Sequence, residues 1–314
     1  MKLSVVIPTR DRQHTLEKAL NAYLTQTALS GLFEILVIDD GSSDGTAQLV
    51  AAFRGSSNSL DVRYFRQERR GPAAARNLGI RQAAGDVVLF SDDDVIPGRS
   101  LVSEHLTWHQ KHPEPSIAVL GYVTWAPELE PTPFMKWYGE RGPLFAYGEF
   151  AGRTELDFRF FYSCNVSLKL EFLRTNGMFD EEFTSAAFED TELGYRLTQR
   201  GMRILYNPAA IGYHYQRFSF ADACRRAQRT AAARMIFDRK AAGISLRESE
   251  ARKGGGGKLL GKRIAVRLVP AFAPLRYLID SRVNLPPFVY RSFLWYYARE
   301  AEIASGHGGQ RQGG

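Results

Sequence analysis

The sequence contains little cysteine and no long apolar run, and each absence argues against a class of protein. Only Cys164 and Cys224 are cysteines, with neither a Cys-x-x-Cys spacing nor a neighbouring histidine. A disulfide framework and a thiolate metal site are therefore disfavoured, and we expect free thiols in a reducing compartment. Because no stretch of about 18 apolar residues occurs, no membrane-spanning helix is predicted. The apolar run Leu3–Ile7 is too short for a signal-peptide core and is predicted to be a strand.

Charge is unevenly distributed along the chain. The net charge is +7, yet the first two hundred residues are rich in acids, whereas the part after about Cys224 is crowded with arginine and lysine. This asymmetry predicts that the C-terminal part meets an anionic surface, either lipid or a phosphate-bearing substrate. A nucleic-acid partner is not predicted, since no recognised nucleic-acid-binding module accompanies the basic residues.

Short apolar runs alternate with amphipathic stretches through the first hundred residues. The runs have the β-branched, uninterrupted character of strands buried on both faces of a parallel sheet. Between them, apolar residues recur at helical spacing. This order predicts an α/β fold with a mostly parallel central sheet and helices on both faces. The predicted strands are residues 3–7, 33–38, 62–65 and 87–90, and the predicted helices lie near 16–24, 47–53 and 72–83.

Three adjacent carboxylates, Asp92, Asp93 and Asp94, directly follow the strand 87–90. Ligands of open α/β sheets bind beyond the carboxyl ends of the strands, where these acids would lie. Their mutual repulsion calls for a cation, and hard oxygen ligands suit Mg²⁺ or Mn²⁺. The alternative is a solvated acidic turn closed by Pro97, because aspartate and proline also favour turns.

Polar residues also follow the first two predicted strands. Thr9 and Asp11 come after the first, and Asp39 and Asp40 after the second, so three loops converge on one sheet edge. Such convergence favours a binding site over three unrelated turns. A Gly-rich dinucleotide fingerprint and a Walker-type loop are missing after the first strand, which disfavours a nicotinamide oxidoreductase and a P-loop kinase.

Five motifs occur in a characteristic order over roughly residues 1–216. They are Val5–Thr9 (VVIPT), Val37–Thr46 (VIDDGSSDGT), Gly71–Gly79 (GPAAARNLG), Asp92–Asp94 (DDD) and Phe188–Leu197 (FEDTELGYRL). The ordered set resembles the family 2 glycosyltransferases. The resemblance implies a GT-A fold with a Rossmann-like nucleotide-binding half and an acceptor half, occupying residues 1–240. It also implies an enzyme that uses a nucleotide-sugar donor and Mg²⁺ or Mn²⁺.

The resemblance assigns donor-side roles to the acid triplet and to Arg76. Asp94 would ligate the metal, while Asp92 and Asp93 would contact the ribose, the donor sugar or metal-bound water. Arg76 would contact the nucleotide, although a solvated helix charge is the alternative. A metal held there would neutralise the leaving pyrophosphate as charge develops.

The first two loops would form the nucleoside pocket. By resemblance, Asp40 would accept the imide N–H of a pyrimidine, and Pro8, Thr9 and Asp11 would line the pocket. Arg10 stands where many relatives have an aromatic side chain that stacks on the base. A guanidinium plane can also stack on a nucleobase, so a uridine nucleotide remains the predicted donor.

Acceptor activation is assigned to Asp190. The second acid of the Glu189–Asp190 pair is the family's catalytic base, which would take the acceptor proton as the sugar inverts. On local grounds alone, Asp190 could instead cap a helix N-terminus. Similarly, His214 is either a further metal ligand, as in several GT-A relatives, or a packed residue.

Two segments between these motifs are assigned more coarsely. Residues 161–168 alternate like a strand and resemble the family segment beneath the donor and acceptor pockets. The predicted loop 127–151 is rich in aromatic residues, which suit a sugar face, a lipid-linked acceptor or an ordinary packed lid. These aromatics are Phe134, Trp137, Tyr138, Phe145 and Tyr147.

The C-terminal part is predicted to be an appendage. Residues 241–257, with four consecutive glycines, are expected to form a linker, followed by a basic and aromatic helical extension over 258–304 and a disordered tail over 305–314. Basic residues interleaved with aliphatics suit an interfacial membrane helix, but a helix packed on the domain has the same pattern. A cytoplasmic protein, with or without attachment to the inner membrane face, is therefore expected.

Together these observations predict a hexosyltransferase. It would move a sugar from a nucleoside-diphosphate sugar, with UDP favoured, to a carbohydrate or lipid-linked acceptor in cell-surface polysaccharide or glycolipid synthesis. The alternatives are a sugar-phosphate nucleotidyltransferase and a non-catalytic nucleotide-binding relative.

Overall fold

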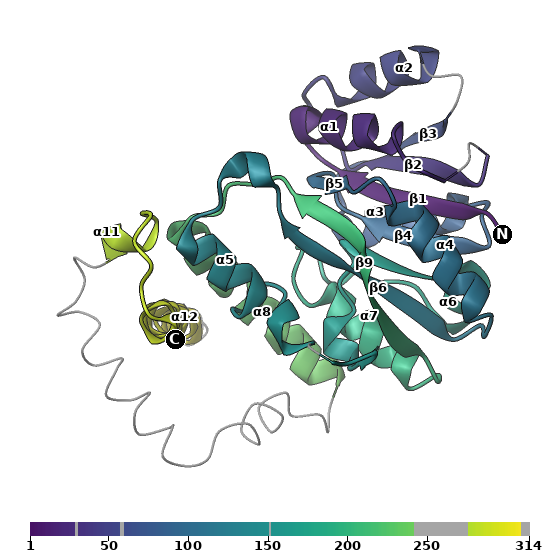
Figure 1. The fold of residues 1–314 in the computed structure, drawn as a ribbon. Coiled ribbons are helices and arrows are strands. Elements are labelled where there is room, and N and C mark those ends of the chain that lie inside the picture. Colours follow the sequence, from purple (N-terminus) through teal and green to yellow (C-terminus); the bar gives the residue numbers. More distant parts are fainter. Residues whose placement is uncertain (29–30, 57–59, 151, 242–275, 309–314) are drawn as a thin grey trace. The chain divides into compact units, whose positions relative to one another are not determined.

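The computed structural model describes residues 1–28, 31–56, 60–150, 152–241 and 276–308 (Figure 1). The chain divides into two compact units. The first comprises residues 1–129 and 145–216, and the second comprises residues 130–144 and 217–314. The predicted linker from residue 242 onward, the basic part of the extension over 258–269 and the tail from residue 309 lie outside the described residues.

The first unit contains one mixed sheet, and its N-terminal half is parallel. In the described residues the strand order is β3-β2-β1-β4-β8-β6-β9-β5, with β7 also paired to β9. All four predicted strands are present. Every residue of β2 is buried, whereas Val62 is the only buried residue of β3. The parallel strands are β1 (Leu3–Thr9), β2 (Phe33–Asp39), β3 (Asp61–Arg66) and β4 (Val87–Ser91).

The other half of the sheet combines both strand directions. β8 runs antiparallel to β4 and β6, whereas β9 runs parallel to β6 and antiparallel to β5 and β7. The α/β fold class is confirmed. Parallel pairing occurs among β1, β2, β3 and β4 and between β6 and β9, whereas β8, which lies between these two groups, is antiparallel to both of its neighbours. These strands are β5 (Val95–Pro97), β6 (Ile117–Trp125), β7 (Glu155–Leu156), β8 (Asn165–Lys169) and β9 (Arg203–His214).

Helices cover both faces of this sheet, as predicted. Leu3, Val5 and Ile7 of β1 share one hydrophobic core with residues of α1 (Gln13–Tyr23), α2 (Thr46–Ser56) and α4 (Leu101–Lys111). On the other face lies α3 (Pro72–Gln82), where a Cβ on Gly79 would come within 2.3 Å of Val6 Cγ1. Glycine therefore lets α3 approach β1 closely. The other α-helices among the described residues of this unit are α6 (Leu170–Asn176) and α7 (Glu189–Thr198).

A bulge interrupts the pairing of β6 with β9. Gly121 pairs with Asn207, but the next residue, Tyr122, pairs with Ile211, so residues 208–210 bulge out of the ladder. Asn165 fastens the bulge by donating from Nδ2 to the carbonyl oxygen of Ala210 at 2.8 Å. β9 nevertheless continues through these residues to His214.

Two local predictions need correction. Of the predicted strand 161–168, only residues 165–168 are in a strand, which is β8. The chain before them forms a 3₁₀ helix, Phe158–Phe160, capped by Asp157, and then a turn in which Asn165 N donates to Tyr162 O at 3.2 Å. The predicted loop 127–151 contains a helix, α5 (Pro133–Glu140). Thr132 accepts a hydrogen bond from Met135 N, and Pro133 occupies the first turn, which together favour a helix start.

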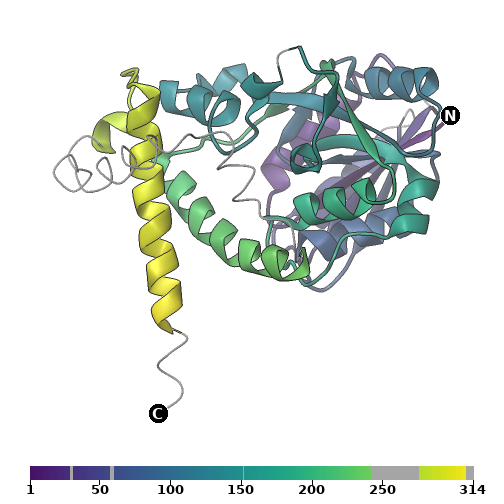
Figure 2. The same ribbon diagram turned by 90° about the horizontal axis from the view of Figure 1, so that it is seen from below.

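The second unit contains α5, α8 (Phe220–Lys240), α11 (Arg276–Ile279) and α12 (Pro287–Gly308). Of these, α5, α8 and α12 pack together through aromatic side chains. Phe134 of α5 lies 5.8 Å from Phe220 and 5.5 Å from Tyr290, measured between ring centroids. A capping box of Ser219 and Asp222 begins α8. Figure 2 shows α12 beginning beside the N-terminal part of α8. The aromatics of α5 are thus core residues and not an exposed sugar platform.

Candidate functional site

The acid triplet follows β4 and is held in place by the next strand. β5 pairs with the end of β9, so that Val95 lies opposite His214 and Tyr215 N donates to the carbonyl oxygen of Asp94 at 2.7 Å. The side chains of Asp93 and Asp94 are only 8% and 5% exposed, whereas that of Asp92 is 33% exposed. A solvated turn is therefore excluded for the last two acids, and Pro97 belongs to β5.

Arg12 compensates the two buried acids. Its Nη1 atom forms an ion pair with Asp94 Oδ2 and lies 3.4 Å from Asp93 Oδ1, while Thr9 Oγ1 donates to Asp93 Oδ2 at 2.7 Å. Burial, and then the charge of Asp94, raises the pKa of Asp93 to about 8. Burial also acts to raise the pKa of Asp94, but His214 and Arg12 outweigh it and lower that pKa. Asp94 is therefore the more strongly anionic member of the pair.

His214 faces the same carboxylate from β9. Its Nε2 atom lies 3.7 Å from Asp94 Oδ1, and its ring packs edge-on against Trp125 at 5.2 Å between centroids. The buried Nδ1 atom has no hydrogen-bond partner among the described residues. The structure thus brings together the two predicted metal-ligating residues, although it contains no group of three or more His, Cys, Asp and Glu suited to a metal within its described part.

Arg76 joins the acid triplet to the predicted catalytic helix. It is 3% exposed, and it donates from Nη2 to Asp92 Oδ1 at 2.9 Å and from Nη1 to Glu189 Oε1 at 3.0 Å. Burial alone would lower the pKa of Arg76, but the surrounding carboxylates of Asp92, Glu189 and Asp190 outweigh it and raise that pKa. The alternative of a solvated surface charge is excluded, because the guanidinium is a buried bridge between two acidic segments.

The start of α7 presents Glu189 and Asp190 in an unusual backbone setting. Phe188, the residue before the helix, has a left-handed φ of 64°, which is costly for a bulky side chain and concentrates at functional sites. Half-buried Asp190 accepts a hydrogen bond from Thr191 N at 2.7 Å. Burial, followed by the charge of Asp190, raises the pKa of Glu189 to about 7.

Asp40 organises the loop that leads into α3. Its carboxylate accepts hydrogen bonds from Gln67 Nε2, Arg70 N and Gly71 N, each at 2.8 Å. A Cβ on Gly71, which has a φ of 90°, would lie 2.6 Å from Thr184 O, so glycine is required there. A carboxylate has about four acceptor positions, which leaves one for a ligand. The predicted contact between Asp40 and a nucleobase stays a prediction.

The first loop is tied to the second through Asp11. Its Oδ1 atom accepts from Ser43 N at 2.7 Å and from Ser43 Oγ at 3.0 Å, and the backbone bond contributes most to lowering the pKa of Asp11. Asp11 also has a left-handed φ of 52°. Arg10 lies beside it, with Nε 3.5 Å from Asp11 Oδ2, and Pro8 is part of β1. Their predicted nucleoside contacts likewise stay predictions.

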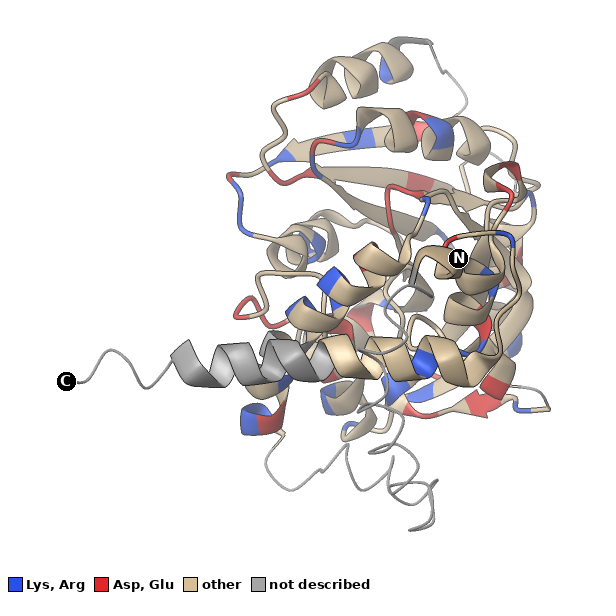
Figure 3. Cartoon of the chain, turned by 90° about the vertical axis from the view of Figure 1, so that its left-hand side faces the viewer, with Lys and Arg blue, Asp and Glu red and all other residues tan. Residues whose placement is uncertain are grey.

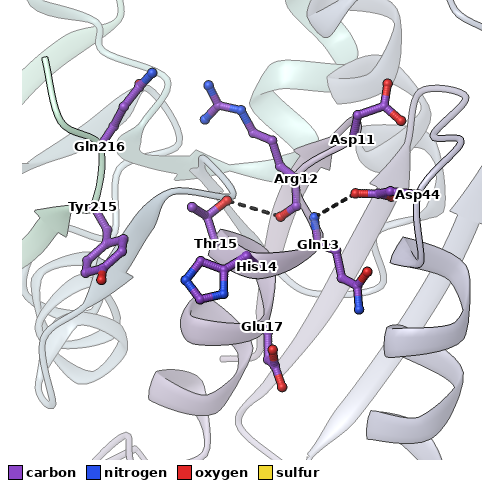
Figure 4. Close-up of a pocket in the computed structure, with 9 residues that line it drawn as sticks. All are labelled: Asp11, Arg12, Gln13, His14, Thr15, Glu17, Asp44, Tyr215 and Gln216. Atoms are coloured by element: carbon purple, nitrogen blue, oxygen red, sulfur yellow. Dashed lines mark hydrogen bonds between the residues drawn. The ribbon is translucent and has the colours of Figure 1, made fainter. Parts of the chain in front are cut away.

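A cavity of about 540 Å³ opens beside Arg12 (Figure 4). Arg12 and Gln13 line it from the start of α1, and Tyr215 and Gln216 line it from the segment after β9. Gln13 N donates to Asp44 Oδ2 at 3.0 Å, so the first turn of α1 is already capped. Arg12 therefore borders both an open cavity and the buried acids.

Sequence reasoning missed two residues of this constellation. The sequence patterns assign no role to Arg12, and they name Glu189 only as the neighbour of Asp190. A charge count could have indicated both, because two buried adjacent acids need a nearby cation and a buried arginine needs nearby anions.

The chain matches known families over most of its length. The family described as "Glycosyl transferase family 2" matches residues 4–162, and "Glycosyl transferase family group 2" matches residues 157–298. The validoxylamine A glucosyltransferase of Streptomyces hygroscopicus subsp. limoneus is 34% identical over 224 residues, which cover 64% of this chain and 48% of that protein. The chain thus spans about half the length of this relative.

Solved structures show the same fold at low sequence identity. The mannosyltransferase PcManGT from Pyrobaculum calidifontis, in complex with GDP-Man and Mn²⁺, has a TM-score of 0.66 and 21% identity, covering 96% of this chain and 86% of that one. TarS 1–349 of S. aureus in complex with UDP has a TM-score of 0.56 and 20% identity, covering 99% of this chain and 93% of that one.

The fold is the GT-A fold of these solved structures. Because a family match covers half of its residues, the chain belongs to glycosyl transferase family 2. The predicted family and fold class are therefore confirmed, and this family membership supports the predicted glycosyltransferase class.

The raised pKa of Glu189 predicts how stability depends on pH. The pKa of Glu189 is about 7 in the folded protein and 4.5 for a glutamate in an unfolded chain. Between pH 4.5 and 7 the folded protein therefore binds more protons at this residue than the unfolded chain does. As the pH rises from about 4.5 to 7, protonation of Glu189 therefore ceases to stabilise the fold, and the free energy of unfolding falls by a few kcal/mol at most. We expect Glu189→Gln to flatten this pH dependence in urea unfolding.

The exposed Glu171→Gln variant is the control, because it removes one carboxylate without touching the buried bridge. A Glu189→Gln protein whose unfolding free energy follows the wild-type pH profile would show that Glu189 titrates normally.

Proposed function

We propose that this chain transfers a sugar from a nucleoside-diphosphate sugar to an acceptor hydroxyl, with a divalent metal and with inversion at the anomeric carbon. One observation carries the proposal: Arg76 binds Asp92 and Glu189 at once, which sets the acid triplet beside the start of α7. An acid loop for the donor and a carboxylate for the acceptor are what such a reaction requires side by side. Family membership favours this activity over the nucleotidyltransferase alternative.

The residues present fit a divalent cation. Asp94 Oδ1 and His214 Nε2 face each other at 3.7 Å, and one carboxylate with one imidazole leaves room for phosphate and water ligands. Bound there, Mg²⁺ or Mn²⁺ would neutralise negative charge that develops on the leaving diphosphate. The Mn²⁺ in the mannosyltransferase complex supports this assignment.

Asp190 is the proposed general base. It stands in the first turn of α7, where the helix dipole favours its ionised form, and it is half-buried and so reachable from solvent. The preceding residue, Glu189, is fixed by the hydrogen bond that its Oε1 atom accepts from Arg76 Nη1 at 3.0 Å. Asp190 would accept the proton of the acceptor hydroxyl while the hydroxyl oxygen attacks the anomeric carbon.

Donor and acceptor remain proposals. We propose a UDP-sugar, with Asp40, Pro8, Thr9, Arg10 and Asp11 lining the nucleoside pocket and Asp92 and Asp93 contacting ribose or sugar. A hexose fits the name of the glucosyltransferase relative. The acceptor would be a carbohydrate or a lipid-linked sugar in cell-surface polysaccharide or glycolipid synthesis. Two free cysteines favour a cytoplasmic location.

A ligand panel tests the donor. Thermal unfolding is followed with UDP-, GDP- and dTDP-sugars, each with and without Mn²⁺. We expect one nucleotide to raise the melting temperature only when metal is present, because ligand at about 100 times its dissociation constant stabilises by about 2.7 kcal/mol. No stabilisation by any of the three with metal would contradict the proposal.

Asp190→Asn tests the base. We expect loss of transfer by at least about a hundredfold, since general bases contribute about that much or more, with donor affinity nearly unchanged. The readouts are initial rate and isothermal titration of donor. Asp61→Asn, a half-exposed carboxylate at the start of β3, is the control. Equal losses of rate and of donor affinity would instead assign Asp190 to donor binding.

Arg12→Gln tests the acid pair. In the wild type a metal ion would have to displace the Arg12 guanidinium from Asp94, and without that guanidinium two buried carboxylates lose their compensating charge. We expect the variant to melt at lower temperature without metal and to gain more from Mn²⁺ alone than the wild type does. Arg10→Gln, two residues away, is the matched control. An equal Mn²⁺ shift in both variants would show that Arg12 does not compete with metal.

A further inference from the structure

One face of α12 is part of the core of the second unit. Between residues 287 and 297 the helix carries a single charged residue, Arg291, and Figure 3 shows little charge along this part. Tyr290, Phe293 and Leu294 are 1%, 3% and 7% exposed. Tyr290 and Phe293 pack against Phe134 and Phe220, so this face is covered by α5 and α8.

The opposite face of α12 exposes aromatic side chains to solvent. Phe288 is 67% exposed and Trp295 is 41% exposed, and Arg291 lies between them on the same side. At 3.6 residues per turn these three positions share one side of the helix, away from Tyr290 and Leu294.

Further exposed apolar side chains lie in α11 and in the turn before α12. Tyr277 and Leu278 of α11 are 72% and 39% exposed, and Val283 is 48% exposed. The exposed Arg282 lies within the turn and pairs with Glu130. We call the set Tyr277, Leu278, Val283, Phe288 and Trp295 the apolar face of the second unit. Apolar side chains gathered in this way commonly mark an interaction site.

We propose that this apolar face docks on an anionic lipid bilayer. Residues 217–314 contain 19 lysines and arginines against seven aspartates and glutamates, a net charge of +12, whereas residues 1–216 contain 22 against 27, a net charge of −5. The apolar face and the positive charge thus belong to the same part of the chain. Exposed tryptophan and tyrosine beside arginine are typical of segments that lie in the membrane interface.

Two other arrangements fit less well. Among the helices that the structure describes, none is long and apolar enough to cross a bilayer, so contact would be with the surface. A second copy of the chain would bring two strongly positive segments together, and their repulsion opposes that pairing. Anionic lipid headgroups instead complement the charge.

The test uses the full chain and vesicles, without any nucleotide sugar. Pelleting is compared for vesicles of phosphatidylcholine alone and for vesicles containing phosphatidylglycerol. We expect binding to the anionic vesicles, and Phe288→Ser/Trp295→Ser to weaken partitioning at least about tenfold, because two aromatic side chains no longer leave water. The control is Met235→Ser on α8, whose side chain is 72% exposed but lies outside the apolar face.

A second readout reports contact with lipid directly. Brominated lipids should quench the fluorescence of Trp295, and Trp295→Phe should abolish that quenching while preserving most of the binding. The proposal is overturned if the double variant binds vesicles as the wild type does, or if Met235→Ser weakens binding equally. It is also overturned if the wild type ignores anionic vesicles but sediments as a dimer that the double variant dissociates. Because no donor is present, failure here would leave the proposed transferase activity untouched.

Discussion

The site depends on one buried guanidinium. Arg76 comes from α3, which begins at the loop that Asp40 organises, and it binds the end of β4 and the start of α7 at the same time. Taking a charge out of water is costly, so this bridge persists only because carboxylates meet it on two sides. Three segments far apart in the sequence are thereby fixed relative to each other, and the acids they carry cannot separate without leaving a charge unpaired.

The sequence predicted the parallel half of the sheet and the position of its acids well. Strands buried on both faces must be apolar throughout, so their runs are visible, and the carboxyl ends of parallel strands must meet at one edge. Asp94 and His214 were therefore named from pattern and resemblance together, and the structure places them 3.7 Å apart. Their proximity is an outcome of β5 pairing with β9, and the three-residue β5 is too short to have a periodic signal of its own.

What could not be predicted depends on contacts distant in sequence. Nothing local to Arg12 distinguishes a solvent-facing loop arginine from one that neutralises acids some eighty positions later. Similarly, the aromatics of α5 were compatible with a sugar platform until Phe220 and Tyr290 were seen to cover them. Charge compensation and burial are properties of the folded arrangement, and sequence patterns report them only where periodicity is strong.

The bulge between β6 and β9 determines which face of the sheet the following side chains of β9 point to. Side chains alternate across a strand, so an odd number of extra residues exchanges the two faces for everything that follows. Residues 208–210 are three extra positions, and His214 consequently faces the way that Asn207 does, although seven steps separate them. An insertion or deletion of one residue here would turn His214 away from Asp94, whereas a change of two would preserve its side. The length of this segment, more than its composition, thus encodes which side chain meets the acid loop.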